Sequence, residues 1–167
     1  MKLKFSVYAI IVLLSITGCQ QETVYHRYQP TGENGWLMHD SLFYTLPSQV
    51  LPGAFKLNIG VRHTELYPYK DIWIEIGSKG NTTQKDTFHL YLTDKEGHWH
   101  NSTTARLYQC DVDKGTLHLS SQDTLLYMIH LMNDSLLTGI HDVGIRLSLP
   151  SRINTEKHEE QNGKSPQ

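Results

Sequence analysis

Apolar and polar residues alternate along most of this chain from about residue 40 onward. The alternation is clearest at 55–61, 72–76, 88–92 and 143–149, where every second residue is Phe, Ile, Leu or Val. Successive side chains of a β-strand point to opposite faces, so this pattern predicts strands with one buried and one solvated face. No segment keeps an apolar stripe of helical period for three turns. The sequence therefore predicts an all-β fold.

Turn-forming residues separate the predicted strands. Clusters of Gly, Pro, Asn and Asp occur at 52–53, 80–81, 94–97, 113–115 and 133–134. Strands punctuated in this way predict an antiparallel β-sandwich of about seven to nine strands. Residues 125–132 are apolar on both faces except at His130, which is typical of a central strand.

The N-terminus has the layout of a secretory signal. Lys2 and Lys4 precede a stretch of about 12 apolar residues, 5–16, which is too short to span a bilayer as a helix. The stretch ends at Gly18-Cys19, which resembles the lipobox of bacterial lipoproteins. That resemblance implies cleavage after Gly18 and acylation of Cys19, and several acyl chains anchor a protein stably.

These features divide the chain into four parts. Residues 1–18 are predicted to be a lipoprotein signal peptide, and 19–35 a lipidated tether that contains one possible short strand, 24–28. Residues 36–150 form the predicted sandwich, and the charged segment 151–167 a disordered tail. The residue after the cysteine is Gln20 rather than Asp, which favours the outer membrane, and the few acids nearby favour its periplasmic face.

Charge and cysteine content exclude two classes of protein. Without residues 1–18, which hold two lysines and no acid, 13 basic and 17 acidic side chains remain, so we expect no nucleic-acid partner. Acylation of Cys19 would leave Cys110 as the last of two cysteines, so the fold is not a disulfide scaffold. We expect Cys110 to be a small buried strand residue.

No pattern in the sequence indicates catalysis or a metal. His98 and His100 would share one face of a strand, but no third ligand follows them. The serine elbow of hydrolases is absent, and Cys110 has no catalytic motif around it. We therefore predict no cofactor, no metal site and no enzymatic activity.

Aromatic residues leave two interpretations open. Trp36, Tyr67, Tyr69 and Trp73 could form a stacking surface for glycan or peptidoglycan, or a patch that binds a protein. Alternatively, they close the open ends of the sandwich.

Several segments resemble the GldH family of gliding motility lipoproteins of the Bacteroidota. They are Gly35-Trp36, residues 57–62, Tyr67-Pro68-Tyr69 with 70–74, and residues 137–146. The resemblance covers about residues 24–149. It implies a non-catalytic lipoprotein of the cell envelope whose protein partners belong to the gliding and type IX secretion apparatus.

The same segments supply the candidate site residues besides Cys19. These are Arg62, Tyr67, Pro68, Tyr69, Gly139, Asp142 and Gly144. One interpretation is a surface specific to the family. The other is a structural corner, in which Arg62 pairs with Asp142 and the glycines permit close strand packing.

Overall fold

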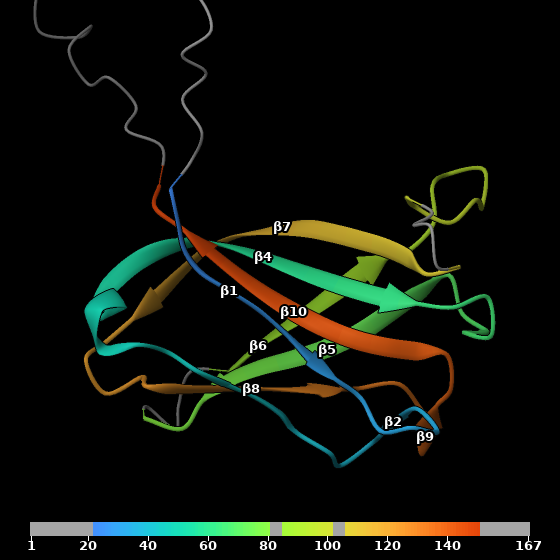
Figure 1. Ribbon diagram of the computed structural model, residues 1–167, viewed down its shortest axis with the longest axis horizontal. Coiled ribbons are helices and arrows are strands. Elements are labelled where there is room, and N and C mark those ends of the chain that lie inside the picture. The colour runs from blue at the N-terminus through green and yellow to red at the C-terminus, as the bar shows by residue number, and fades with distance from the viewer. Residues whose placement is uncertain (1–21, 81–84, 102–105, 151–167) are drawn as a thin grey trace, which may run out of the picture.

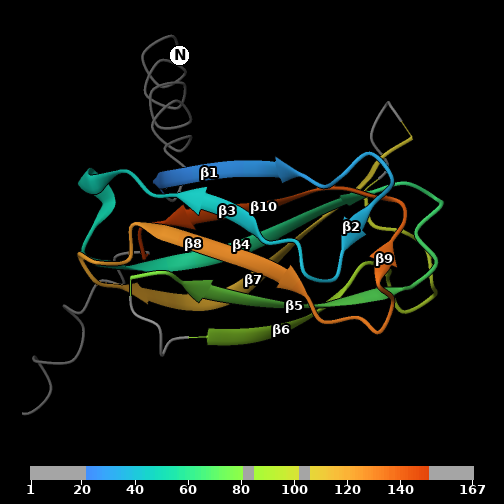
Figure 2. The ribbon, with the colours of Figure 1, turned by 90° about the horizontal axis from the view of Figure 1, so that it is seen from below.

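The computed structural model describes residues 22–80, 85–101 and 106–150. Two four-stranded sheets stack face to face, and a two-stranded ribbon lies at one end of the stack (Figures 1 and 2). The prediction of an all-β antiparallel sandwich is confirmed. The elements are β1 (Thr23–Pro30), β2 (Trp36–Leu37), β3 (Leu42–Thr45), a 3-10 turn η1 (Ser48–Val50), β4 (Gly53–His63), β5 (Asp71–Ser78), β6 (Lys85–Tyr91), β7 (Tyr108–Leu119), β8 (Leu125–His130), β9 (Leu136–Leu137) and β10 (Ile140–Ser148).

All strand pairs between these elements are antiparallel. One sheet has the order β1-β10-β4-β7 and the other β3-β8-β5-β6, while β2 pairs with β9. The described residues contain ten strands, slightly more than predicted, because β2 and β9 are two-residue strands that no alternation could reveal. β8 lies between β3 and β5, as its two apolar faces predicted.

The core lies between the two sheets. Ile59 and Val61 of β4 and Val143 of β10 point inward from one sheet and are fully buried. Ile72 and Ile74 of β5 face them from the other sheet, also with no exposed surface. Complete burial of one such side chain contributes about 1.5–3 kcal/mol of transfer free energy, so this layer is a main source of the stability of the fold.

The first strand corrects the predicted domain boundary. Residues 23–30, assigned above to the tether, form β1, which pairs with β10 along its whole length from Thr23 opposite Ser148 to Pro30 opposite Asp142. The folded domain thus begins at Thr23 instead of Trp36. The predicted signal peptide 1–18, Cys19 and the tail 151–167 lie outside the described residues.

The sandwich has two distinct ends. The chain enters at Glu22 and leaves at Leu149, whose amide donates a hydrogen bond of 2.9 Å to the Glu22 carbonyl oxygen. We call this end, to the upper left in Figure 1, the stem end. The ribbon β2–β9 marks the opposite or far end. Among the described residues, no helix is long and apolar enough to cross a membrane.

Candidate functional site

A tyrosine ring lies across two glycines on the outer face of the β1-β10-β4-β7 sheet. Gly144 of β10 pairs with Tyr28 on one side and with Gly60 of β4 on the other. A Cβ atom on Gly144 would stand 2.8 Å from the Tyr28 ring, and one on Gly60 would stand 2.1 Å from its hydroxyl oxygen. Only glycine therefore leaves room for the ring at both positions.

The Tyr28 ring ends at an acidic group and lies beneath a cation. Its hydroxyl donates a 3.0 Å hydrogen bond to Asp111 Oδ1 on β7. Burial, and then the negative charge of Asp111, raise the pKa of Tyr28, so the hydroxyl keeps its proton. The Arg62 guanidinium carbon lies 3.8 Å from the ring centroid, a cation–π contact. Tyr28 thus connects all four strands of the sheet.

Arg62 also makes an ion pair with Asp142, which belongs to the structural-corner interpretation of the sequence. Its Nη1 lies 3.4 Å from Asp142 Oδ2, and its Nε donates to Gln109 Oε1 at 3.0 Å. The same Asp142 oxygen is 2.9 Å from His141 Nδ1. Asp142 Oδ1 is buried without a hydrogen-bond partner in the described structure. The network of Tyr28, Arg62, Gln109, Asp111 and Asp142 satisfies most of its own polar atoms and leaves few for a ligand.

The remaining predicted residues form a second corner at the far end. Gly139 has φ of +82°, and its Cβ would stand 2.3 Å from the Tyr67 nitrogen. The Gly139 carbonyl accepts a 2.8 Å bond from the Thr64 amide, so the β9–β10 and β4–β5 turns are locked together. Tyr67 is buried and donates to the Asp71 carbonyl at 2.8 Å.

Pro68 and Tyr69 continue this corner toward the surface. Pro68 is exposed, and the Tyr69 hydroxyl donates to the Asp134 carboxylate. A hollow of about 620 Å³ opens nearby between residues 30–35, 64–66 and 138–141. The seven predicted residues therefore occupy two corners: Arg62, Asp142 and Gly144 around Tyr28, and Gly139 with 67–69 at the turns. Both corners have the geometry of the structural interpretation.

A buried histidine lies beside the second corner. The His63 ring centroid is 4.6 Å from that of Trp99, 5.5 Å from that of Tyr108 and 5.8 Å from that of Tyr67. Nδ1 lies 3.0 Å from the Thr64 carbonyl oxygen, which can only accept, so this nitrogen carries the proton. Nε2 is buried without a partner in the described structure, and burial lowers the pKa of His63.

The outer face of the β3-β8-β5-β6 sheet carries exposed aromatic residues. Trp73 stacks on His89, with ring centroids 4.2 Å apart and an angle of 7° between the planes, and Tyr91 follows at 4.4 Å from His89. His89 Nε2 is held 2.5 Å from Asp71 Oδ2. Leu131, just after β8, donates its amide to the Trp73 carbonyl at 2.8 Å. We call Trp73, His89, Tyr91 and Leu131 the aromatic face.

Exposure on this face is high for such side chains. Trp73 is 43% exposed, Tyr91 63% and Leu131 42%. A shallow hollow of about 450 Å³ lies beside Trp73 and Leu131, with Asp71 and Asn133 on its rim. Sequence analysis noted Trp73 but missed its partners, although His89 and Tyr91 occupy the solvated positions of an alternating strand.

The structure divides the four aromatic residues of the sugar-stacking hypothesis. Trp36 and Tyr67 are 1% exposed and belong to the core, where they close the far end as the alternative interpretation predicted. The Trp36 indole donates to the Asp40 carbonyl at 2.9 Å. Tyr69 is half-buried, so among these four residues only Trp73 is exposed.

Neither a metal cluster nor a reactive thiol is found in the described ranges. No group of three potential metal ligands occurs there, and His98 is an exposed side chain 3.3 Å from Asp94. Cys110 is buried on β7, as predicted, and burial raises the pKa of its thiol to about 11. Its sulfur lies 3.3 Å from the Tyr91 carbonyl oxygen.

Comparison with solved structures finds plant-virus structures at low similarity. A chain of the tomato aspermy virus structure is 12% identical, with a TM-score of 0.35, and the match covers 90% of this chain and 97% of the viral chain. The tobacco streak virus coat protein is 9% identical, with a TM-score of 0.26 and coverage of 82% and 95%. These TM-scores are too low to indicate a common fold.

Sequence comparison is more informative. No curated protein sequence matches the chain. A model of the GldH lipoprotein family, however, matches residues 23–147, which begin at β1 and end within β10. This match includes both corners and the aromatic face, and it confirms the resemblance found in the sequence. The chain belongs to the GldH lipoprotein family.

Proposed function

We propose that this protein is a non-catalytic lipoprotein of the cell envelope that works with the gliding and type IX secretion machinery. Membership of the GldH lipoprotein family supports the lipoprotein part of the proposal. The signal-like segment 1–18 and the Cys19 that follows it support an acyl anchor. Gln20 after the cysteine supports the outer membrane, and the low acid content nearby supports its periplasmic face.

The aromatic face is the surface that binds the protein partner. Seven large hydrophobic side chains of the described residues are exposed, and four of them lie on or beside the outer face of the β3-β8-β5-β6 sheet: Phe43, Trp73, Tyr91 and Leu131. Trp and Tyr dominate the binding energy of protein interfaces because they bury large areas at little cost in conformational entropy. On the outer face of the other sheet, the polar side chains around Tyr28 hydrogen-bond to one another. This difference between the faces is the observation that carries the proposal.

Affinity purification tests this function. The tagged full chain is recovered from native envelopes after mild cross-linking, and its partners are identified by mass spectrometry. We expect Trp73→Ala and Tyr91→Ala to reduce recovery of secretion or motility components at least about tenfold, as for hot-spot residues. Leu66→Ala is the matched control, because Leu66 is 73% exposed and belongs neither to the aromatic face nor to the hollow beside Trp73. Equal recovery by all three variants would contradict the proposal.

A glycan-binding module is the second candidate, and one observation favours it. Trp73 stands beside a hollow whose rim carries the polar side chains of Asp71 and Asn133, the arrangement of a sugar-stacking site. Soluble peptidoglycan fragments should then quench tryptophan fluorescence of the purified protein. Quenching that disappears in Trp73→Phe would support glycan binding at this face and contradict the proposal that the face binds a protein.

A further inference from the structure

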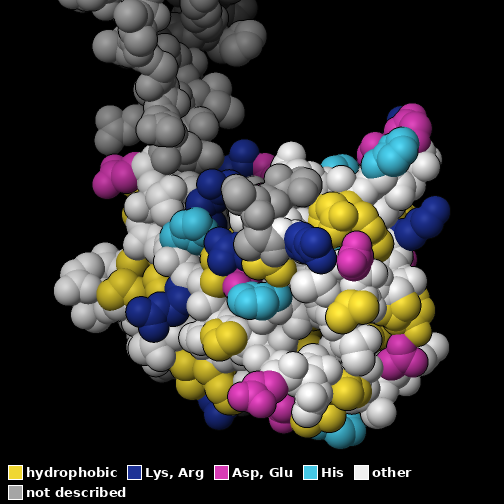
Figure 3. All heavy atoms as spheres, turned by 45° about the vertical axis from the view of Figure 1, so that its right-hand side comes forward, with side chains coloured by type: hydrophobic (Ala, Val, Ile, Leu, Met, Phe, Trp, Pro, Cys, Tyr) yellow, Lys and Arg dark blue, Asp and Glu magenta, His cyan; other side chains and the backbone are white. Residues whose placement is uncertain are grey.

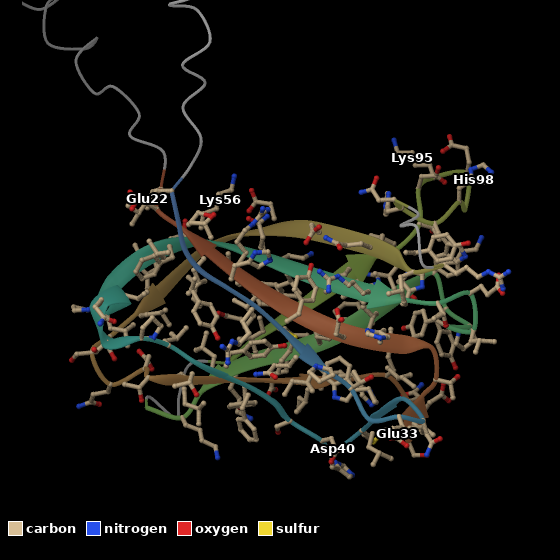
Figure 4. All side chains as sticks on the ribbon, in the orientation of Figure 1. Glu22, Glu33, Asp40, Lys56, Lys95 and His98 are labelled. Atoms are coloured by element: carbon tan, nitrogen blue, oxygen red, sulfur yellow. The ribbon has the colours of Figure 1, made fainter. Side chains whose placement is uncertain are left out.

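The described domain begins very close to the predicted lipid anchor. Cys19 is three residues before Glu22, and a fully extended chain spans at most about 3.6 Å per residue, so their Cα atoms are within about 11 Å of each other. Glu22 lies at the stem end, where Figure 4 labels it together with Lys56, while Glu33 and Asp40 are labelled at the far end. An acyl anchor on Cys19 would thus hold the stem end against the membrane.

One hollow at the stem end is lined by mostly apolar residues and by no charged side chain. It has a volume of about 690 Å³ and is lined by Val24 of β1, by residues within 47–55 and by Leu149. Residues 46–55 contain no charged side chain, and none of the three residues of η1 is buried. Leu149 is 39% exposed, next to the Glu22 carbonyl that holds it.

Basic side chains also lie at the stem end. Lys56 lies near the start of β4 and Lys79 follows the end of β5, so both belong to the stem end. Lys56 is paired with Asp113 at 2.7 Å and remains partly exposed, and Lys79 lies 4.7 Å from the centroid of the Phe43 ring. Figure 3 shows Lys and Arg side chains on the face turned to the viewer, together with acidic and histidine side chains. Apolar residues bordered by cations are the composition that binds the headgroup and acyl boundary of an anionic bilayer.

We propose that Val24, residues 47–54 and Leu149 form a docking surface that rests on the lipid surface carrying the anchor. The proposal depends on acylation of Cys19, as the proposed function does. Lipid contact fixes the orientation of the sandwich: β1 leads away from the membrane and the antiparallel β10 returns to it. With nine residues at about 3.3 Å each, β10 places the far end roughly 30 Å from the membrane. The aromatic face then stands along the side of the molecule, open to partners on the same membrane.

Site-specific fluorescence tests the docking surface. Gln49→Cys places a thiol on exposed η1, and Glu33→Cys places the matched control at the exposed far end. Cys110 does not compete for the dye, because it is buried and its thiol pKa is about 11. The full-length acylated protein, labelled with an environment-sensitive dye, is reconstituted into vesicles of phosphatidylethanolamine and phosphatidylglycerol. We expect a blue shift and at least threefold protection from aqueous iodide at position 49, and neither at position 33.

Separate outcomes distinguish the docking surface from the anchor. If the protein floats with the vesicles but iodide quenches positions 49 and 33 equally, the docking surface is wrong and the acyl anchor still stands. Failure of the Cys19 protein to float any better than Cys19→Ala would overturn the anchor and the proposed function with it. A third outcome concerns Cys19→Ala protein without vesicles. If protection of position 49 from iodide increases with protein concentration there, the stem end binds a second copy of the chain instead of lipid. Leu149→Asp should reduce the protection at position 49 without changing flotation.

Discussion

At the scale of the residue, the position of Tyr28 explains why β4 and β10 carry glycine at positions 60 and 144 and why β7 carries Asp111. Its ring fills the space that side chains on Gly60 and Gly144 would occupy, and it carries a hydrogen bond to Asp111. Aromatic rings laid over strand glycines compensate for the packing that glycine cannot provide. Sequence analysis grouped Arg62, Asp142 and Gly144 with four residues that the structure places at another corner, and it could not name the ring that the three surround, because Tyr28 fell within the predicted tether.

The ring and the glycines should be energetically coupled. Gly144→Ala places a methyl group 2.8 Å from the Tyr28 ring, so we expect it to lower the free energy of unfolding by about 1–3 kcal/mol. In a Tyr28→Ser background the same substitution should have a clearly smaller effect, since the clashing ring is absent. Urea denaturation of the four proteins of this double-mutant cycle measures the coupling. Additive effects would show that the ring moves aside freely.

At the scale of the element, strand periodicity predicts β4, β5 and β10 but not β7, the longest strand. Residues 113–115, predicted as a turn, lie inside β7. β1 was predicted only as a possible short strand, 24–28. β4, β5 and β10 bury the alternating apolar residues that the sequence showed, so two-residue periodicity found these strands without other information, although some residues between the apolar ones are buried too. β1 is an edge strand with an irregular register between Thr23 and Tyr25, which interrupts the alternation. Burial at the far end was left as one of two interpretations, because Trp36 and Tyr67 are buried by tertiary packing of short segments, which no periodic pattern encodes.

Gly139 in the β9–β10 turn allows the cost of a packing clash to be separated from the cost of a left-handed backbone. Gly139 and Gly115 have nearly the same φ, +82° and +83°, but a Cβ on Gly139 would meet the Tyr67 backbone at 2.3 Å, and one on Gly115 has nothing within 4 Å. Left-handed backbone alone should cost Gly115→Ala about 1–2 kcal/mol. Gly139→Ala carries the same strain plus a backbone clash, so we expect a further loss of about 1–3 kcal/mol. Thermal melts of both variants compare them directly, and equal melting temperatures would refute a packing role for Gly139.

At the scale of the whole molecule, the sandwich assigns different tasks to its surfaces. The stem end carries a mostly apolar hollow and faces the proposed anchor, the outer face of the β3-β8-β5-β6 sheet exposes aromatic rings, and the β1-β10-β4-β7 face holds its polar groups in an internal network. The far end closes over buried aromatic residues. Family motifs in the sequence mark the corners that shape the fold. The surfaces proposed to bind lipid and protein consist of exposed residues. The alternating apolar pattern of the sequence marks buried residues only, so it could not identify these surfaces.

Two buried histidines make the stability of the whole domain depend on pH. Burial lowers the pKa of both His63 and His130 from the ordinary value of 6.5. Below about pH 6.5 the unfolded chain therefore binds protons at these positions that the folded protein does not, so the free energy of unfolding falls as pH falls. Each histidine contributes a slope of at most about 1.4 kcal/mol per pH unit.

Denaturant titrations between pH 7 and pH 5 measure this slope. That range lies above the window of Asp94 and Asp113, whose pKa values are lowered from 3.8 by hydrogen bonds to the His98 backbone and the Lys56 side chain, respectively. We expect His63→Phe, which keeps a ring in the aromatic cluster but cannot take up a proton, to reduce the slope. The double variant with His130→Phe should reduce it further. A slope that is the same in wild type and double variant would mean that these rings are protonated as readily in the folded protein as in the unfolded chain.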